Sequence, residues 1–171
     1  MTKTAWVFPG QGSQAVGMGH DLLTTETAKQ RFQQAETILG WSVFDVCQSE
    51  DDKVSSTLYT QPCLYVIESI LADLLMEQGQ QPDFVAGHSL GEYVALYVAQ
   101  VFDFEAGLTL VQRRSELMSY ASAGAMAALM GFKREELDET LAATESVVLA
   151  NDNSPAQVVI SGNPDAVQVV L

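Results

Sequence analysis

The residues best suited to covalent chemistry lie in the segment Gly87-His88-Ser89-Leu90-Gly91, which has the pattern G-x-S-x-G. It follows a predicted strand, "DFVA", and opens a predicted amphipathic helix, which is the setting of a nucleophile elbow. In such a turn the serine takes a strained backbone conformation and its hydroxyl stands exposed beyond the strand end. The backbone N–H of Leu90, at the helix N-terminus, points to where an oxyanion would form. The segment therefore predicts Ser89 as a nucleophile.

The first loop of the chain, "VFPGQGSQAVG" at Val7–Gly17, allows two interpretations. Gly10–Ala15 fits the G-x-G-x-x-G/A loop that holds a dinucleotide pyrophosphate. That loop requires a second strand ending in an acidic residue about 20 residues later. Here "AKQRFQQAETIL" reads as a helix instead, and Pro9 is a poor start for that turn. A G-x-S-x-G enzyme needs a second oxyanion N–H from a loop after a different strand, and we expect Gln11 to supply it.

Two adjacent arginines lie on a predicted helix, Phe104–Tyr120. The apolar face of this helix runs through Leu108, Val111 and Met118. At about 100° per residue, Arg114 falls beside this face and Arg113 nearly opposite it, so Arg113 is expected to be a solvated surface charge. An arginine directed inward costs stability unless it is paired. Arg114 therefore implies a carboxylate partner, either on a ligand or in a structural salt bridge with one of the chain's acids.

Neither histidine of the chain suits the role of general base for a nucleophilic serine, which needs an imidazole within hydrogen-bond reach. His88 directly precedes Ser89, and adjacent strand residues point to opposite faces. His20, in "VGMGHDLL", is expected to be a surface or capping residue. Two histidines without a Cys/His cluster also argue against a zinc site, so we expect no metal and no cofactor.

Composition and charge limit the possible function classes. The chain of 171 residues is long enough for one core, or for one core and a smaller lobe. Its net charge of −14 argues against a nucleic-acid binder, which needs basic surface. No apolar segment approaches the roughly 20 residues that span a bilayer, and the start of the chain lacks the features of a signal peptide. We therefore expect a cytoplasmic protein without membrane contact, with Cys47 and Cys63 as reduced structural thiols.

Hydrophobic periodicity predicts an α/β fold with a parallel sheet in the first part of the chain. Thr4–Phe8 reads as a buried strand, and a helix is expected from about Thr25 to Leu39. A longer helix is expected to start at Gln61-Pro62, with proline at its first position, and another covers Leu90–Phe102. The predicted buried stripes of these three helices are Ala28, Phe32, Ala35 and Leu39, then Leu64, Ile67, Leu71 and Leu74, then Leu90, Val94, Val98 and Val101.

The pattern changes near Ser122–Gly124. A strand "AMAALMGF" is followed by a helix "KREELDETLAAT", a hairpin of "SVVLAN" and "QVVISG", and the start of a helix, "NPDAVQVVL". This order is the first part of a ferredoxin-like unit, and the chain stops inside its second helix. We expect a hydrolase-like parallel-sheet α/β subdomain at residues 1–123, carrying the nucleophile elbow, and an incomplete ferredoxin-like small subdomain at residues 124–171.

Six segments, in order and over the whole chain, closely resemble malonyl-CoA:acyl carrier protein transacylases. The segments are "FPGQGSQ" (Phe8–Gln14), "TQP" (Thr60–Pro62), "GHSLGEY" (Gly87–Tyr93), "QRR" ending at Arg114, "GAMAALMG" (Gly124–Gly131) and "NDNSPAQVVISG" (Asn151–Gly162). In that family a serine is acylated by malonyl-CoA and passes the malonyl group to the phosphopantetheine thiol of acyl carrier protein, in fatty-acid biosynthesis.

The resemblance also implies roles for particular residues. Ser89 matches the nucleophile, and Gln11 and Leu90 match the backbone oxyanion donors. Arg114 matches the arginine that pairs with the malonyl carboxylate. Gln61 and Asn153 fall in motifs that border the family's active site.

The resemblance leaves several points open. The family's catalytic histidine lies past the small subdomain, so we expect a truncated version of a longer enzyme that transfers slowly. The competing interpretations are a serine esterase or thioesterase, in which a carboxylate clamp has no use, and a non-catalytic fragment that forms no covalent adduct. The sequence leaves open the choice between malonyl and methylmalonyl groups and the surface that docks the carrier. A monomer is expected.

Overall fold

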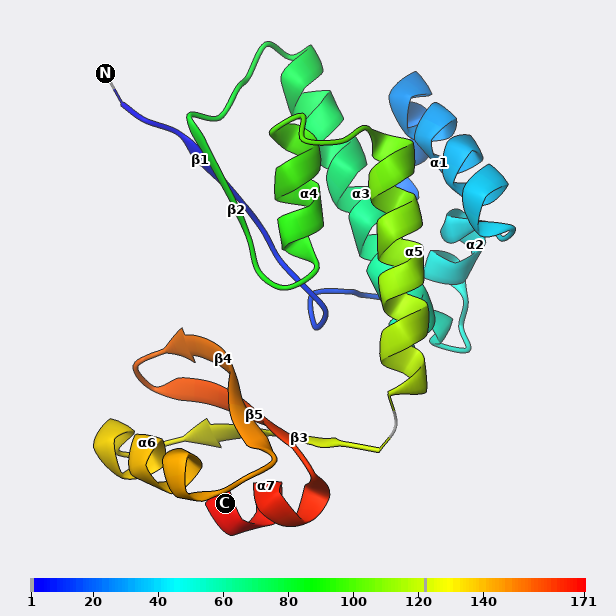
Figure 1. The fold of residues 1–171 in the computed structure, drawn as a ribbon. Helices are drawn as coiled ribbons and strands as arrows, with labels where there is room; N and C mark the ends of the chain where they lie inside the picture. Colours follow the sequence, from blue (N-terminus) through cyan, green and yellow to red (C-terminus); the bar gives the residue numbers. More distant parts are fainter. Residues whose placement is uncertain (1, 122) are drawn as a thin grey trace. The chain divides into compact units, whose positions relative to one another are not determined.

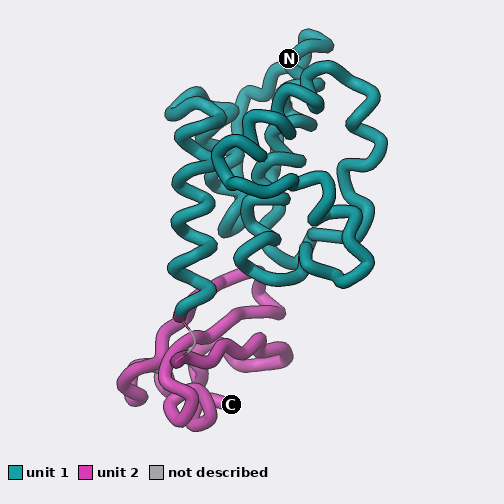
Figure 2. Tube along the Cα trace, turned by 90° about the vertical axis from the view of Figure 1, so that its right-hand side faces the viewer, with its two compact units in different colours: residues 1–120 teal, residues 121–171 magenta. Residues whose placement is uncertain are grey.

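The computed structural model describes residues 2–121 and 123–171. The chain divides into two compact units, residues 1–120 and residues 121–171 (Figure 2). Ser122, near which we expected the sequence pattern to change, lies outside the described residues. The first unit contains a parallel sheet and the second an antiparallel sheet, so the chain has a mixed α/β fold.

The first unit alternates short strands with helices (Figure 1). Its elements, in chain order, are β1 (Ala5–Phe8), the 3-10 turn η1 (His20–Thr24), α1 (Glu26–Leu39), α2 (Val43–Gln48), the 3-10 turn η2 (Lys53–Ser55), α3 (Thr57–Glu77), β2 (Phe84–Gly87), α4 (Gly91–Val98) and α5 (Phe104–Tyr120). Strands β1 and β2 pair in parallel, with Ala5 opposite Phe84 and Phe8 opposite Gly87. This confirms the parallel sheet predicted for the first part of the chain.

Helix α3 is the central helix of this core; its predicted start was wrong, and of its predicted buried stripe Leu64 and Ile67 are buried whereas Leu71 is not. It begins at Thr57, so Pro62 lies inside it rather than at its first position. The Thr60 hydroxyl, which is buried, donates to the Val54 carbonyl at 2.6 Å, and this tertiary contact outweighs the positional preference of proline. From Thr60 to Ile70 the helix is buried on every side, whereas Leu71 of the predicted stripe is 46% exposed.

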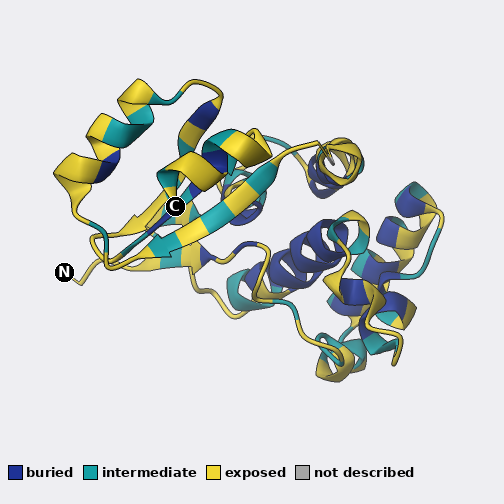
Figure 3. Cartoon of the chain, turned by 90° about the horizontal axis from the view of Figure 1, so that it is seen from below, coloured by how far each residue is buried: buried dark blue, intermediate teal, exposed yellow. Residues whose placement is uncertain are grey.

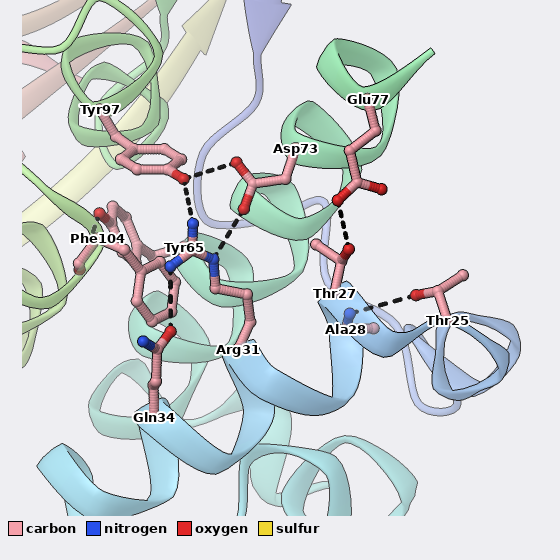
Figure 4. Close-up of polar contacts among 10 residues, drawn as sticks. All are labelled: Thr25, Thr27, Ala28, Arg31, Gln34, Tyr65, Asp73, Glu77, Tyr97 and Phe104. Atoms are coloured by element: carbon pink, nitrogen blue, oxygen red, sulfur yellow. Dashed lines mark hydrogen bonds and ion pairs between the residues drawn. The ribbon is translucent and has the colours of Figure 1, made fainter.

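Helix α1 has the predicted bounds and buried face, because its apolar residues follow a single stripe. Its Arg31 links four helices through a polar cluster (Figure 4). Nε of Arg31 donates to Asp73 on α3 at 2.8 Å, and Nη2 donates to the Tyr97 hydroxyl on α4 at 2.7 Å. Tyr97 in turn donates to Asp73 at 2.6 Å, and the guanidinium lies 4.5 Å from the ring centroid of Phe104 on α5.

Helix α4 ends earlier than predicted. Gln100 has a left-handed backbone with φ 59°, and the N–H of Val101 donates to the Leu96 carbonyl at 3.0 Å. This pattern terminates the helix, so Val101 is 64% exposed instead of continuing the buried face of Val94 and Val98. Helix α5 then begins where predicted, with the Asp103 carboxylate accepting from the Ala106 N–H at 2.8 Å.

The second unit has the element order predicted from the sequence. Its elements are β3 (Ala125–Met130), α6 (Arg134–Ala143), β4 (Val147–Ser154), β5 (Gln157–Gly162) and α7 (Pro164–Val170). The strands form an antiparallel sheet in the order β3-β5-β4. Along β3 and β5 less accessible residues alternate with more accessible ones, whereas in the first unit the buried residues gather along the helices (Figure 3). Each unit therefore has its own core.

Candidate active site

The turn between β2 and α4 has the strained geometry of a nucleophile elbow. Ser89 has φ 54°, in the left-handed region that residues with a Cβ rarely adopt. The His88 carbonyl accepts from the Gly91 N–H at 3.0 Å, and the Ser89 carbonyl accepts from the Glu92 N–H at 3.3 Å. These two bonds close the first turn of α4 directly behind Ser89. The hydroxyl of Ser89 therefore stands at a helix N-terminus, where the helix dipole favours negative charge.

Glycine is required on both sides of this turn. A Cβ at Gly87 would overlap the backbone of Gly91 and Glu92, and a Cβ at Gly91 would overlap the Phe8 carbonyl of β1. The strand, the turn and the helix can therefore approach one another only because these two positions carry no side chain.

Arg114 lies beside Ser89, although 25 residues separate them in the chain. Its Nη2 donates to the Ser89 hydroxyl oxygen at 2.9 Å, and its Nη1 donates to Oε1 of Gln61 at 2.5 Å. The guanidinium also lies 5.7 Å from the ring centroid of Tyr93. Within residues 2–121 and 123–171, no carboxylate forms an ion pair with Arg114. The cation is thus held in place by neutral groups.

The neighbouring arginine has the opposite environment. Arg113 is exposed and forms an ion pair with Glu116 on its own helix at 3.0 Å. This confirms the predicted difference between the two arginines, in which Arg113 faces solvent and Arg114 faces inward.

Gln61 fixes the position of Arg114 and is itself fully buried. Its Oε1 accepts from Arg114, while its Nε2 donates to the Met118 sulfur at 3.2 Å. Arg114 and Met118 are four residues apart on α5, so they share a helix face and enclose the Gln61 carboxamide of α3 from two sides. We predicted Met118 as an apolar position only. Its spacing from Arg114 was the signal that could have linked it to the site.

The loop after β1 lies against the elbow (Figure 1). Gly10 is buried, and a Cβ there would come within 2.5 Å of the His88 carbonyl. The next residue, Gln11, is anchored because its Nε2 donates to the Thr57 hydroxyl at 3.0 Å, at the start of α3. The loop is tightened by a bond from the Ser13 N–H to the Gly10 carbonyl at 3.2 Å. The structure thus brings the loop of Gln11 to the same turn as Ser89 and Leu90.

The remaining candidates are His20 and His88 in the first unit and Asn153 in the second. The ring of His20 stacks on Phe44, with 6.2 Å between the centroids. The His88 imidazole is directed toward Gly10, as its Nδ1 would be 3.3 Å from a Cβ there. Asn153 is on β4 of the second unit, where its amide donates to Gln157 at 3.2 Å. The cluster of Ser89, Arg114 and Gln61 is formed by the first unit alone.

Two further findings concern the described part of the chain as a whole. No group of three or more His, Cys, Asp or Glu side chains there is arranged to hold a metal ion. None of its helices combines the length and the apolar character that a membrane crossing requires.

A serine on a strained turn, at a helix N-terminus and beside an arginine, is an arrangement suited to acyl transfer with an anionic substrate. The family model for the acyl transferase domain matches residues 5–171. The chain belongs to the acyl transferase domain family.

Within this family the chain is similar to malonyl CoA-acyl carrier protein transacylases. It is 64% identical over 169 residues to that of Synechocystis sp. PCC 6803, and the alignment covers 99% of this chain and 58% of the relative. The crystal structure of the Synechocystis transacylase superposes with a TM-score of 0.95. A structure of a type II PKS acyl-carrier protein in complex with its malonyl-transacylase matches at 37% identity and a TM-score of 0.90, covering 99% of this chain and 58% of that chain.

Proposed function

We propose that the protein transfers a malonyl group from coenzyme A to the phosphopantetheine thiol of acyl carrier protein, through a malonyl-serine intermediate at Ser89. The observation that carries this proposal is Arg114, a cation held beside the Ser89 hydroxyl without a carboxylate of its own among the described residues. Holding an arginine there by neutral groups is costly unless a ligand carboxylate completes the site. The malonyl group has such a carboxylate at the end opposite its thioester.

The reaction consists of two acyl transfers. The Ser89 oxygen attacks the thioester carbon of malonyl-CoA, the carbon–sulfur bond breaks, and coenzyme A leaves as a thiol that carries the former hydroxyl proton. The carrier's thiol then attacks the malonyl-serine ester, and the serine hydroxyl is restored. Each step passes through a tetrahedral oxyanion, for which we assign the backbone N–H groups of Gln11 and Leu90 as donors.

The other residues of the site have supporting roles in this proposal. Gln61 orients Arg114 toward the malonyl carboxylate through the bond to Nη1. Asn153, on β4 of the second unit, belongs to a motif that borders the active site in the family it resembles. The base that accepts the Ser89 proton is the family's histidine, to which neither His20 nor His88 corresponds. We therefore expect slow acylation from the 171 residues alone.

The wider setting follows from the same resemblance. We propose a hydrolase-like large subdomain, residues 1–123, and a small subdomain that begins as a ferredoxin-like unit, residues 124–171. The antiparallel order β3-β5-β4 and the strand–helix–hairpin–helix sequence support the latter. We place the activity in the cytoplasm, in fatty-acid biosynthesis, and Cys47 and Cys63 are both buried free thiols, as is usual there. The complex of a relative with an acyl-carrier protein supports the choice of partner.

The experiment that tests the proposal measures the intact mass of the protein after brief incubation with malonyl-CoA and acid quenching. We expect an adduct of malonyl size that Ser89→Ala abolishes. Arg114→Ala should slow its formation about tenfold or more, which corresponds to the loss of one charge-assisted contact. Arg113→Ala is the matched control, because it removes a cation from the same helix at an exposed position. Equal effects of the two arginine variants would contradict the carboxylate clamp.

A serine esterase or thioesterase is the competing enzyme. Such an enzyme would form an adduct with acetyl-CoA or a neutral ester as readily as with malonyl-CoA, and Arg114→Ala would leave the acetyl reaction unchanged. We expect the intact protein to prefer malonyl-CoA and the Arg114→Ala variant to lose that preference.

A further inference from the structure

Met118, near the end of α5, is itself exposed and is bonded to a buried group. The residue is 45% exposed, and its sulfur accepts a hydrogen bond from Nε2 of Gln61 at 3.2 Å. Gln61 is fully buried on α3, and α3 and α5 lie side by side (Figure 1). Small molecules in solution can therefore reach a side chain that helps to hold the site.

Three hydrogen bonds in series join the Met118 sulfur to Ser89. The first is the bond from Nε2 of Gln61 to the sulfur. In the second, Oε1 of Gln61 accepts from Nη1 of Arg114 at 2.5 Å, and in the third, Nη2 of Arg114 donates to the Ser89 hydroxyl at 2.9 Å. Because one planar carboxamide makes the first two bonds, Gln61 cannot follow a new acceptor without moving Oε1 relative to Arg114. A chemical change at the sulfur is thereby passed on to Arg114.

The thioether is a weak acceptor, and it is also the member of this series that oxidants attack. Oxidation to the sulfoxide converts a flexible apolar side chain into a polar, chiral one. An oxygen added on the side of Gln61 would have to fit into the 3.2 Å between the sulfur and Nε2. An oxygen added on the solvent side would become the main acceptor and leave Nε2 with a poorer partner. In both cases the bond that holds the Gln61 carboxamide is altered.

The other sulfur atoms of the chain provide internal comparisons. Cys47 and Cys63 are fully buried, so an oxidant in solution reaches them less readily than Met118. Met126 and Met130, on β3 of the second unit, are 63% and 75% exposed. These two methionines are open to the same oxidant, but they do not belong to the series of bonds that ends at Ser89.

We propose that Met118 is a site of reversible oxidation by hydrogen peroxide, and that its sulfoxide slows the acylation of Ser89 by displacing Gln61 from Arg114. A lone pair of the sulfur attacks one peroxide oxygen, the sulfur–oxygen bond forms and the oxygen–oxygen bond breaks. The second oxygen leaves as water with both peroxide protons, so the sulfur loses two electrons and the peroxide gains them. A methionine sulfoxide reductase restores the thioether.

The modification weakens the site without dismantling it, because the Tyr93 ring, 5.7 Å from the guanidinium, still supports Arg114. The effect on acylation rests on the proposed function, whereas the oxidation of Met118 and its effect on packing do not.

The first test is brief treatment with hydrogen peroxide, quenched with catalase and followed by peptide mapping. We expect Met118 to gain one oxygen atom at a rate within about threefold of the rates of Met126 and Met130, since all three are exposed. A Met118 peptide that stays unmodified while Met126 and Met130 are fully oxidised would overturn the proposal.

The second test measures malonyl-adduct formation by intact mass in the same samples. The rate should fall about fivefold or more as Met118 is oxidised, and recover after treatment with methionine sulfoxide reductases. Met118→Leu should start at a lower rate and lose no more with peroxide. The matched control combines Met126→Leu with Met130→Leu, and it should keep the full peroxide effect. An equal peroxide effect in Met118→Leu, or none in the natural chain with Met118 oxidised, would overturn the proposal.

Thermal unfolding gives a readout that does not need the acyl reaction. Peroxide should lower the unfolding midpoint of the natural chain by a few degrees, because the buried Gln61 carboxamide loses its acceptor. The midpoint of Met118→Leu should stay nearly constant, and equal shifts in the two proteins would overturn the proposal. An untreated protein that forms no malonyl adduct would contradict the proposed function instead, and the peptide map and the unfolding midpoints would then decide this inference by themselves.

Discussion

Glu68 should make the stability of the first unit fall as pH rises toward neutrality. Burial raises the pKa of its carboxyl from 4.5 to about 8 in the folded protein. Below pH 4.5 the folded and unfolded states both carry the proton, so the group imposes no pH-dependent cost. Between pH 4.5 and pH 8 the unfolded chain releases this proton while the folded protein retains it. The free energy of unfolding must therefore decrease over this interval and level off above it.

The size of the effect follows from the width of the interval. Each pH unit costs about 1.4 kcal/mol, so the loss is roughly 3 kcal/mol by pH 7 and about 5 kcal/mol in total. These are order-of-magnitude values. Even half of them would be a large fraction of the 5–15 kcal/mol that is typical of a folded domain. Glu68→Gln removes the titration and keeps the shape, so its free energy of unfolding should exceed that of the natural chain by an amount that grows with pH.

The assay is urea denaturation at pH 5, 6, 7 and 8, with Glu36→Gln as the control for loss of an exposed negative charge. We expect the difference between Glu68→Gln and the natural chain to increase by about 2–3 kcal/mol from pH 5 to pH 7.5. The Glu36→Gln difference should stay nearly constant. A Glu68→Gln difference that is independent of pH, or that shrinks as pH rises, would refute the argument that this carboxyl is buried without a partner.

Three further substitutions test the packing around the site. Gly91→Ala should destabilise the chain by about 3 kcal/mol and abolish malonyl-adduct formation, since its Cβ would overlap the backbone of β1. Urea denaturation measures the stability and intact mass measures the adduct. A variant of unchanged stability would contradict the close approach of α4 to β1. Met118→Leu leaves Nε2 of Gln61 without its acceptor. It should therefore slow adduct formation severalfold and lower the free energy of unfolding by about 1 kcal/mol. An unchanged acylation rate would show that Met118 does not support the site. Tyr97→Phe leaves Asp73 without one donor and should cost about 1–2 kcal/mol in urea denaturation, without any change in the adduct.

The sequence predicted those elements whose signals are local. Helix α1 was predicted because its four buried residues form one stripe. The bounds of helix α5 and the burial of Leu108 and Val111 were also predicted, whereas Met118 of the predicted face is 45% exposed. The start of α3 was missed, since the rule for Pro62 is positional and the deciding bond from Thr60 to Val54 is tertiary. The end of α4 was missed because nothing in the composition of its last turn signals a left-handed residue at Gln100.

The site could be predicted only in part, for a related reason. The elbow motif indicated Ser89, and helical periodicity separated Arg114 from Arg113. Neither could show that the partners of Arg114 would be a serine and a glutamine, 25 and 53 residues away in the chain, instead of an acid. Helical periodicity could not predict that Glu68 is buried without a hydrogen-bond partner among the described residues. The period of a helix shows which residues share a face, but not whether a polar side chain on that face has a hydrogen-bond partner.

The left-handed backbone at Ser89 lowers the stability of the fold at the same residue whose hydroxyl we propose for the reaction. A residue with a Cβ loses about 1–2 kcal/mol in that conformation, whereas glycine avoids this steric cost and pays only its larger loss of backbone entropy on folding. Selection for thermal stability alone would therefore act against serine at position 89, and glycine there would lack the hydroxyl that we propose as the nucleophile. Directed evolution of this protein toward heat resistance should consequently be coupled to a screen for acylation, because relief of the strain at the elbow would also remove the proposed nucleophile.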